Sequence, residues 1–336
     1  MTFDHAWTPT APPWGQTESG DERRVGVEIE FIGPDVAQTS SALLPVLGGR
    51  LDVVSRYEHV IRGDEAGPWR VELDFAYLRD RARDQAAAEQ APSLAEEWAD
   101  AALRAGAEAM VPVEVVSPPL PMSRLGEVQA VLAALRGAGA VGTRAGWTYA
   151  FGMQLNPEIP RADAATVLAY LRAFLCLQDW LRRESRVDLT RRLTGYTAPF
   201  PDEYIQRVVA PGYAPTLAGL MDDYLASNPT RNRPLDFLPL FAEIDEERLR
   251  RVVSDERVKA RPALHYRLPN CELDEPGWGV QVPWGQWLEV EHLAADGPRL
   301  DEVGRHYAAF LDRPFERLVG DWAEEVERWL SPRPGR

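Results

Sequence analysis

The sequence predicts an α+β protein, with helices packed on one face of an antiparallel β-sheet whose other face is polar. Segments of alternating apolar and polar residues recur along the chain, and longer segments of helical periodicity lie between them. At roughly 100–200 residues per domain, the 336 residues allow one large domain or two. We find no internal linker in the sequence, which favours one domain. We therefore expect a disordered leader over residues 1–21, a single domain over 22–330 and a short tail over 331–336.

The composition excludes several classes of function. The formal net charge is −15, which disfavours nucleic acid because this field would repel a phosphate backbone. No apolar run reaches the roughly 20 residues of a membrane span, and the N-terminus lacks the features of a secretory signal. The two cysteines, Cys176 and Cys271, are too few for a disulfide framework, so we expect a cytoplasmic protein. Lys259 is the one lysine, and it follows Val258 rather than the glycine of a P-loop.

Strands and helices follow from the periodicity of each segment. Residues 23–32 alternate strictly, with Gly26, Glu28 and Glu30 on the polar side, which is typical of a strand. The same period predicts strands over residues 69–75, 111–116, 147–156 and 263–268. Helices are predicted over residues 80–109, 123–136, 163–184, 216–225, 246–253, 299–311 and 315–330.

The polar side of the predicted sheet is rich in hydrogen-bond acceptors. A solvated sheet face is the simple interpretation of such alternation, but a solvated face usually mixes Lys, Thr, Ser and Arg. Glu28 and Glu30 are two residues apart, so their carboxylates point the same way about 7 Å from each other. Oxygen ligands favour a hard cation, Mg²⁺ or Mn²⁺. The residues of this side are Glu28, Glu30, Glu72, Asp74, Glu114, Gln154, Asn156, His265 and Arg267.

Two motifs resemble a known family when they are taken in this order. The segments Arg24-Val-Gly-Val-Glu-Ile-Glu-Phe31 and Pro112-Val-Glu-Val-Val-Ser-Pro-Pro-Leu120 resemble motifs of the amidoligases. Amidoligases are carboxylate–amine ligases related in fold to glutamate–cysteine ligase and glutamine synthetase. The segments 69–74, 231–240 and 261–270 also look similar to parts of that family, and the resemblance covers about residues 23–290.

The resemblance implies a curved sheet whose concave polar face is the active face and binds ATP and Mg²⁺ or Mn²⁺. It implies that Glu28, Glu30 and Glu114 are catalytic carboxylates that bind the metal, and that Arg267 is a catalytic arginine that contacts phosphate. His265 is a further candidate metal ligand, although relatives often have glutamate there.

Other residues are expected to bind ATP or substrate. Relatives often have histidines in the strand that here carries amides. The two arginines of the 231–240 segment suit phosphate or carboxylate, or they pin their loop. The two acids of the second strand extend the metal shell or form a polar rim, and Asn270 contacts a ligand or serves as a turn residue. These candidates are Gln154, Asn156, Glu72, Asp74, Arg231, Arg233 and Asn270.

The implied reaction is ATP-dependent formation of an amide through an acyl phosphate. Its partners are ATP, a small carboxylic acid or peptide carboxylate, and an amine. No serine or cysteine nucleophile is required, because position and charge carry the catalysis. The alternative is a non-catalytic protein that retains the fold and binds a metabolite or peptide. A third reading is a metal-dependent hydrolase that uses the same carboxylates without ATP.

Overall fold

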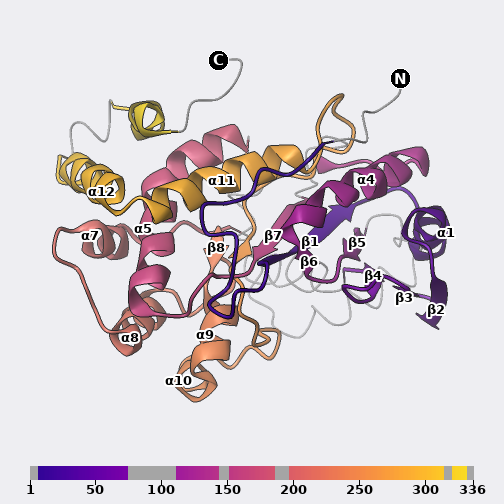
Figure 1. Ribbon diagram of the computed structural model, residues 1–336, viewed down its shortest axis with the longest axis horizontal. Coiled ribbons are helices and arrows are strands. Elements are labelled where there is room, and N and C mark those ends of the chain that lie inside the picture. The colour runs from indigo at the N-terminus through magenta and orange to yellow at the C-terminus, as the bar shows by residue number, and fades with distance from the viewer. Residues whose placement is uncertain (1–6, 75–110, 144–150, 186–196, 314–319, 331–336) are drawn as a thin grey trace, which may run out of the picture.

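The computed structural model describes residues 7–74, 111–143, 151–185, 197–313 and 320–330. At its centre lies a nine-stranded antiparallel sheet in the order β2-β3-β4-β5-β1-β7-β9-β8, with β6 paired to β1 (Figure 1). The predicted α+β class and antiparallel sheet are thus confirmed. The strands are β1 (Arg24–Phe31), β2 (Arg50–Ser55), β3 (Glu58–Arg62), β4 (Trp69–Leu73), β5 (Val113–Val116), β6 (Leu120–Pro121), β7 (Met153–Pro157), β8 (Leu235–Asp236) and β9 (His265–Tyr266).

Helices cover the apolar face of the sheet. Helix α1 packs on β2, β3 and β4 and on α4, while α11 packs on β7 and on the long helix α5 (Figure 1). The helices are α1 (Val36–Leu47), α4 (Val128–Gly137), α5 (Ala164–Glu184), α7 (Asp202–Val209), α8 (Leu217–Ser227), α9 (Leu238–Ile244), α10 (Glu246–Arg250), α11 (Gln281–Ala295), α12 (Gly297–Leu311) and α14 (Trp322–Glu325), with 3₁₀ turns η2 (Met122–Glu127) and η4 (Val326–Trp329).

The alternation of β1 explains how the sheet acquires two different faces. Val25, Val27, Ile29 and Phe31 are fully buried in the core between sheet and helices. Since successive side chains of a strand point to opposite faces, the polar residues between them project to the other side. The neighbouring strands β4, β5 and β7 obey the same pattern, so their polar side chains share that side.

Several elements differ from the sequence-based expectations. The helix expected from Ser123 begins as the 3₁₀ turn η2, and the α-helix starts at Val128. Helix α1, which was not predicted, is fixed by a capping box between Asp35 and Gln38. The strand expected over 147–156 is β7 within the described residues. The helix expected over 80–109 lies outside them.

The expectation of a disordered leader is wrong for residues 7–21. The indole nitrogen of Trp284 donates to the carbonyl of Thr10 at 3.0 Å, and Arg23 Nη1 donates to the carbonyl of Trp14 at 2.7 Å. The Trp14 ring lies 6.0 Å from that of Tyr170. Contacts of Trp14, Trp284 and Arg23 thus fix residues 7–21, although the composition of this segment predicted no structure. Residues 1–6 and the expected tail over 331–336 lie outside the described chain.

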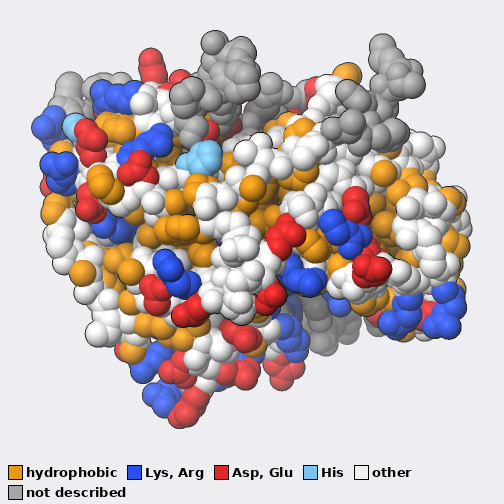
Figure 2. Space-filling view, viewed as in Figure 1, with side chains coloured by type: hydrophobic (Ala, Val, Ile, Leu, Met, Phe, Trp, Pro, Cys, Tyr) orange, Lys and Arg blue, Asp and Glu red, His pale blue; other side chains and the backbone are white. Residues whose placement is uncertain are grey.

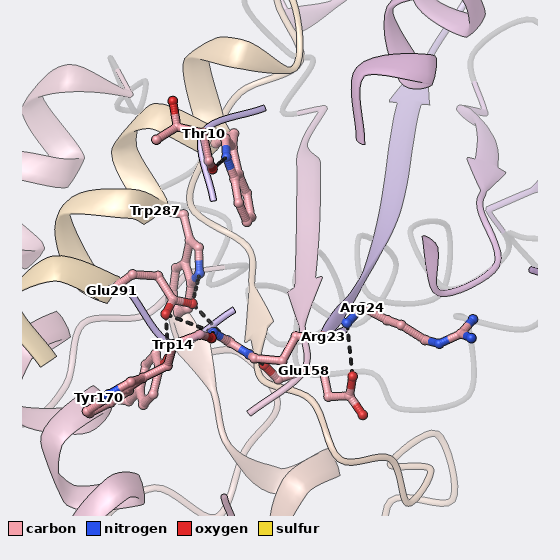
Figure 3. A network of polar contacts seen from close by, with 9 residues as sticks. Thr10, Trp14, Arg23, Arg24, Glu158, Tyr170, Trp287 and Glu291 are labelled. Atoms are coloured by element: carbon pink, nitrogen blue, oxygen red, sulfur yellow. Dashed lines mark hydrogen bonds and ion pairs between the residues drawn. The ribbon is translucent and has the colours of Figure 1, made fainter. Parts of the chain in front are cut away.

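A buried ion pair fixes the residue that precedes β1 (Figure 3). Arg23 Nη2 lies 2.8 Å from Glu291 Oε1, and neither side chain is exposed. Tyr170 of α5 and Trp287 of α11 both donate hydrogen bonds to the Glu291 carboxylate, at 2.5 and 2.8 Å. Arg23 Nε also donates to the carbonyl of Glu158 at 2.7 Å. The network therefore joins the entry to β1 with the end of β7 and with the helical layer.

The surface charges are mixed in sign. Figure 2 shows acidic and basic side chains interspersed at the lower end of the molecule, where α10 lies in Figure 1. There Arg248 Nη1 lies 2.7 Å from Asp222 Oδ1, and Arg251 Nη2 lies 2.6 Å from Glu247 Oε1. Within the described chain, no helix has both the length and the apolar character needed to cross a membrane.

Candidate active site

Four glutamates form a row across four neighbouring strands of the polar face. Glu30 on β1 is the register partner of Glu114 on β5. Glu114 in turn opposes Glu72 on β4, and Glu72 opposes Glu58 on β3. Neighbouring strands lie about 4.8 Å apart, so each carboxylate has a like charge on the next strand. We call these four residues the acidic row. Glu58 was missed because the β2–β3 hairpin was not predicted.

The crowding of carboxylates changes their ionisation. Burial, together with the charges of Glu28 and Asp74, raises the pKa of Glu114 well above its ordinary value. Burial also raises the pKa of Glu72, against the nearby positive charge of Arg70. Like charges in a shared, poorly solvated site disfavour ionisation. The acidic row is therefore a place where a bound cation would relieve an unfavourable field.

Gln154 of β7 links the acidic row to β9. Its Nε2 donates to Glu30 Oε1 at 2.5 Å, and the Gly152 amide donates to Glu30 Oε2 at 2.7 Å. Its Oε1 lies 2.5 Å from His265 Nε2 and can only accept, so that ring nitrogen carries the proton. Burial and the charge of Arg267 lower the pKa of His265 to about 3. The ring is therefore neutral at neutral pH.

Glu28 lies beside this chain of hydrogen bonds. Asn156 Nδ2 donates to Glu28 Oε1 at 2.9 Å, and His265 Nε2 lies 3.6 Å from Glu28 Oε2. Arg261 Nη1 lies 3.9 Å from Glu28 Oε1. Burial opposes ionisation of Glu28, but the Nε2–H of the neutral His265 ring, the charge of Arg261 and the hydrogen bond from Asn156 lower its pKa below the ordinary value. Unlike Glu114, Glu28 is thus held as a carboxylate by its neighbours.

Three arginines gather on the opposite side of the same face. Arg231, Arg261 and Arg267 all act on the buried Asp236, which is the register partner of His265. Burial and the charge of Arg267 lower the pKa of Arg231, as expected when a second guanidinium group is nearby. We call the three arginines the basic side. Planar guanidinium groups in such an arrangement suit phosphate or carboxylate oxygens.

Asp236 was not identified as a site residue from the sequence. Its Oδ1 accepts a hydrogen bond from the Leu238 amide at 2.9 Å, and its Oδ2 is buried without a hydrogen-bond partner among the described residues. Burial raises its pKa to about 6, although Arg267 and Arg231 favour the carboxylate. The two-residue strand β8 has no periodic signal. The Arg-Asn-Arg-Pro-Leu-Asp segment was the only pointer to it.

Most of the expected site residues come together on this face, but Arg233 does not. The Arg233 guanidinium donates to the carbonyls of Ser227, Ala198 and Pro199. It also lies 5.7 Å from the Phe200 ring centroid. These contacts occupy the side chain within the fold, so Arg233 pins its loop, one of the two roles considered above. Its partners are partly buried main-chain carbonyls rather than the surface salt bridges that were expected.

Asn270 and Asp74 lie at the margins of the site. Asn270 forms a β-bridge with Gly152 and therefore continues the line of Glu30 beyond β7. Asp74 directly follows β4, and its amide donates to the carbonyl of Pro112 at 2.9 Å. The pKa of Glu114 reflects the charge of Asp74, which places that carboxylate near the acidic row.

Within the described residues, no three His, Cys, Asp or Glu side chains converge closely enough to ligate one ion by themselves. This is compatible with Mg²⁺, which usually retains waters and is held by one or two carboxylates together with substrate phosphates. The acidic row fits such an ion because its carboxylates raise one another's pKa. The buried Oδ1 of Asn156 is a further oxygen without a hydrogen-bond partner in the described chain.

A cleft of about 440 Å³ opens at the Glu28 end of the polar face. Gly26 lies on its floor, and it is bounded by the ends of β5 and β7 and by the segment that precedes β9. We call it the Gly26 cleft. Its volume falls in the range of about 300–1,000 Å³ that is usual for small-molecule sites. It contacts the site through Glu28, Asn156 and Arg261.

A family model described as "putative amidoligase enzyme" matches residues 21–289. The chain belongs to the amidoligase family. The resemblance inferred from the β1 and β5 motifs is thereby confirmed. The amidoligase match contains every strand from β1 to β9, and so it contains both the acidic row and the basic side. Neither a curated protein nor a solved structure gives a significant match to this chain.

Proposed function

We propose that this amidoligase is an ATP- and Mg²⁺-dependent carboxylate–amine ligase with a fold like that of glutamine synthetase and glutamate–cysteine ligase. The observation that carries the proposal is the division of one sheet face into an acidic row and a basic side. The two halves meet at Glu28, Gln154 and His265. An ATP–metal complex combines a cation with anionic phosphates. The acidic row can bind the cation, and the basic side can bind the phosphates next to it.

Glu28, Glu30 and Glu114 are the residues that would hold Mg²⁺ or Mn²⁺, with His265 at the margin. A divalent ion bound there would neutralise charge on the β- and γ-phosphate oxygens. Gln154, Gly152 and Asn156 fix the orientation of the Glu30 and Glu28 carboxylates by direct hydrogen bonds. Such preorganised groups lower the reorganisation needed during reaction.

Arg267 and Arg231 would bind the phosphate chain from the basic side. In the proposed reaction, an oxygen of the substrate carboxylate attacks the γ-phosphorus, and the bond to the β-phosphate breaks to release ADP. The amine nitrogen then attacks the acyl carbon, phosphate leaves, and the nitrogen loses a proton to give the amide. The chain contributes position and charge in both steps.

The test is to incubate the protein with Mg-ATP, hydroxylamine and a panel of carboxylic acids. We expect ADP and an acyl hydroxamate in equal amounts with at least one acid. Glu28→Gln should abolish turnover and leave thermal unfolding near that of the parent. The matched control is Glu302→Gln, an exposed site on α12, which should leave turnover unchanged.

Two outcomes would contradict the ligase. Absence of Mg-ATP binding in calorimetry, together with no ADP across the panel, would favour a non-catalytic binding protein. Metal-dependent cleavage of an amide without ATP would favour a hydrolase instead.

A further inference from the structure

The Gly26 cleft combines a small, apolar wall with a charged rim. Its wall includes Pro68, Pro118, Pro119 and Pro262, whose side chains offer no hydrogen bonds. Gly26 leaves the floor of the cleft open because it has no side chain. A Cβ atom at this position would lie 3.4 Å from the Cβ of Asn156. The rim has three cations, Arg24, Arg70 and Arg261. The cleft therefore suits a compact ligand with an apolar body and negative ends.

The cleft arginines differ from the arginines of the general surface. The other arginine ion pairs among the described residues are no longer than 3.5 Å, as in Arg62 with Asp52 at 2.6 Å and Arg124 with Asp64 at 2.9 Å. At the cleft, Arg70 Nε is 3.8 Å from Glu72, and Arg261 Nη1 is 3.9 Å from Glu28. Arg24 Nη1 donates to the Pro119 carbonyl at 3.2 Å. Among the described residues, none of the three has a carboxylate within ordinary hydrogen-bond distance.

The two carboxylates that line the cleft offset only part of the charge of its three arginines. Glu158 Oε2 accepts a hydrogen bond from the Arg24 main-chain amide at 2.9 Å. Glu28 is hydrogen-bonded to Asn156 and faces the acidic row. Three guanidinium groups thus surround a cavity in a chain whose net charge is −15. Local positive charge of this kind in an acidic protein favours an anionic ligand.

We propose that the Gly26 cleft binds the acid substrate, and that this acid carries a second anionic group besides the carboxylate that reacts. Arg24 and Arg70 bind the second anion at the outer rim. The reacting carboxylate lies at the inner end, beside Glu28 and Arg261. The inference rests on the proposed ligase function and adds the class of its acid substrate, a dicarboxylate or similar dianion with a short apolar spacer.

The positions of Arg231 and Arg267, two arginines of the basic side, separate this ligand from the nucleotide. Neither Arg231 nor Arg267 lines the cleft, whereas Arg261 and Glu28 do. The phosphates and the acid would therefore approach Glu28 from two directions. This arrangement brings a carboxylate and a γ-phosphate together at the residue that both sites share.

The first experiment measures binding without nucleotide. Isothermal calorimetry in MgCl₂ compares succinate, glutarate and adipate with butyrate, pentanoate and hexanoate, which match them in carbon number. We expect at least one dicarboxylate to bind ten-fold or more tightly than its monocarboxylate. Arg70→Gln and Arg24→Gln should each weaken that binding by about ten-fold, as expected for one lost charge-assisted contact. Arg251→Gln, directly after α10, is the control and should leave it unchanged. Equal binding within every matched pair, or no effect of both cleft variants, would overturn the proposal.

The second experiment separates the cleft from the nucleotide site in the hydroxamate assay. Arg70→Gln should raise the KM for the acid about ten-fold and leave the KM for ATP unchanged. A raised KM for ATP alone would overturn the proposal, because the cleft would then hold nucleotide. A protein that forms no ADP yet prefers dicarboxylates through Arg70 would refute the ligase and retain the cleft assignment.

Discussion

Glu114 on β5 stands opposite Glu30 on β1 as its register partner, although both carry carboxylates on the same sheet face. In its own strand each glutamate alternates with apolar residues that are buried on the other face: Ile29 and Phe31 in β1, and Val113 and Val115 in β5. Like charges placed directly opposite each other destabilise a strand pair. The hydrophobic core therefore maintains an arrangement that the polar face alone would oppose. Such arrangements concentrate at functional sites.

Replacing Glu114 with glutamine should stabilise the metal-free protein and remove its response to Mg²⁺. Burial and its acidic neighbours raise the pKa of Glu114, so ionising it costs free energy in the folded state. A neutral amide of the same shape removes that cost, with a gain of about 1 kcal/mol at neutral pH. Thermal unfolding with EDTA and with MgCl₂ measures both effects. Wild type should gain stability on adding MgCl₂, and the variant should not. An equal gain in both proteins would contradict a cation site at Glu114.

Replacing Gln154 with leucine should destabilise the protein and disturb the site. The change removes the hydrogen bonds that Gln154 makes to Glu30 and His265, and it leaves two buried polar atoms without partners. The expected cost is about 1–3 kcal/mol in the free energy of unfolding, measured by urea denaturation. Gln206→Leu on α7 is the matched control and should change it little. If Gln154→Leu lowers the free energy of unfolding by no more than Gln206→Leu does, the hydrogen bonds of Gln154 contribute nothing to stability.

The faces of the sheet could be predicted because they depend on local alternation. In β1 the period of two places Glu28 and Glu30 on one side and four apolar residues on the other, as the structure confirms. Neither the order of the strands nor their register is local. That Glu72 opposes Glu114, and that Glu58 extends the line, depends on pairing between distant segments. Alternation alone does not contain this information.

Other features were beyond sequence reasoning for physical reasons. Arg231 and Arg233 are chemically alike and two residues apart, yet of the two only Arg233 donates hydrogen bonds to main-chain carbonyls in the described part of the chain. Helix α11 is buried on most of its surface, so it has no amphipathic stripe to reveal it. The leader is held by single contacts such as Trp284 with Thr10, and its own composition gave no sign of them.

Replacing Asp236 with asparagine should remove a pH dependence of stability. Burial raises the pKa of Asp236 from 3.8 to about 6. A carboxyl whose folded-state pKa exceeds its unfolded value costs stability as pH rises between these two values. Wild type should thus lose stability between about pH 4 and pH 6, and the variant should gain on the order of 3 kcal/mol at pH 7. Urea denaturation across this range measures the slope.

The control for Asp236 is an aspartate with the opposite shift. Hydrogen bonds from Arg257 lower the pKa of Asp255 to about 2. Its contribution to stability is therefore present at neutral pH and is lost as pH falls from about 4 toward 2. Asp255→Asn should lower stability at pH 7. If Asp236→Asn behaves like Asp255→Asn, Asp236 is held ionised by the basic side, and the burial argument is wrong.

Replacing Arg23 with methionine should have the largest effect on stability among these variants. The change leaves the carboxylate of Glu291, a residue of α11, as a fully buried charge without its partner. Removing one member of a buried ion pair costs about 3–5 kcal/mol. Arg251→Met breaks an exposed pair and should cost less than about 1 kcal/mol. The double variant Arg23→Met, Glu291→Leu should cost less than the sum of its single changes, because it leaves no isolated charge. Strictly additive costs in urea denaturation would show that the two residues act independently. Tyr170 and Trp287 would then be the groups that hold Glu291 in place.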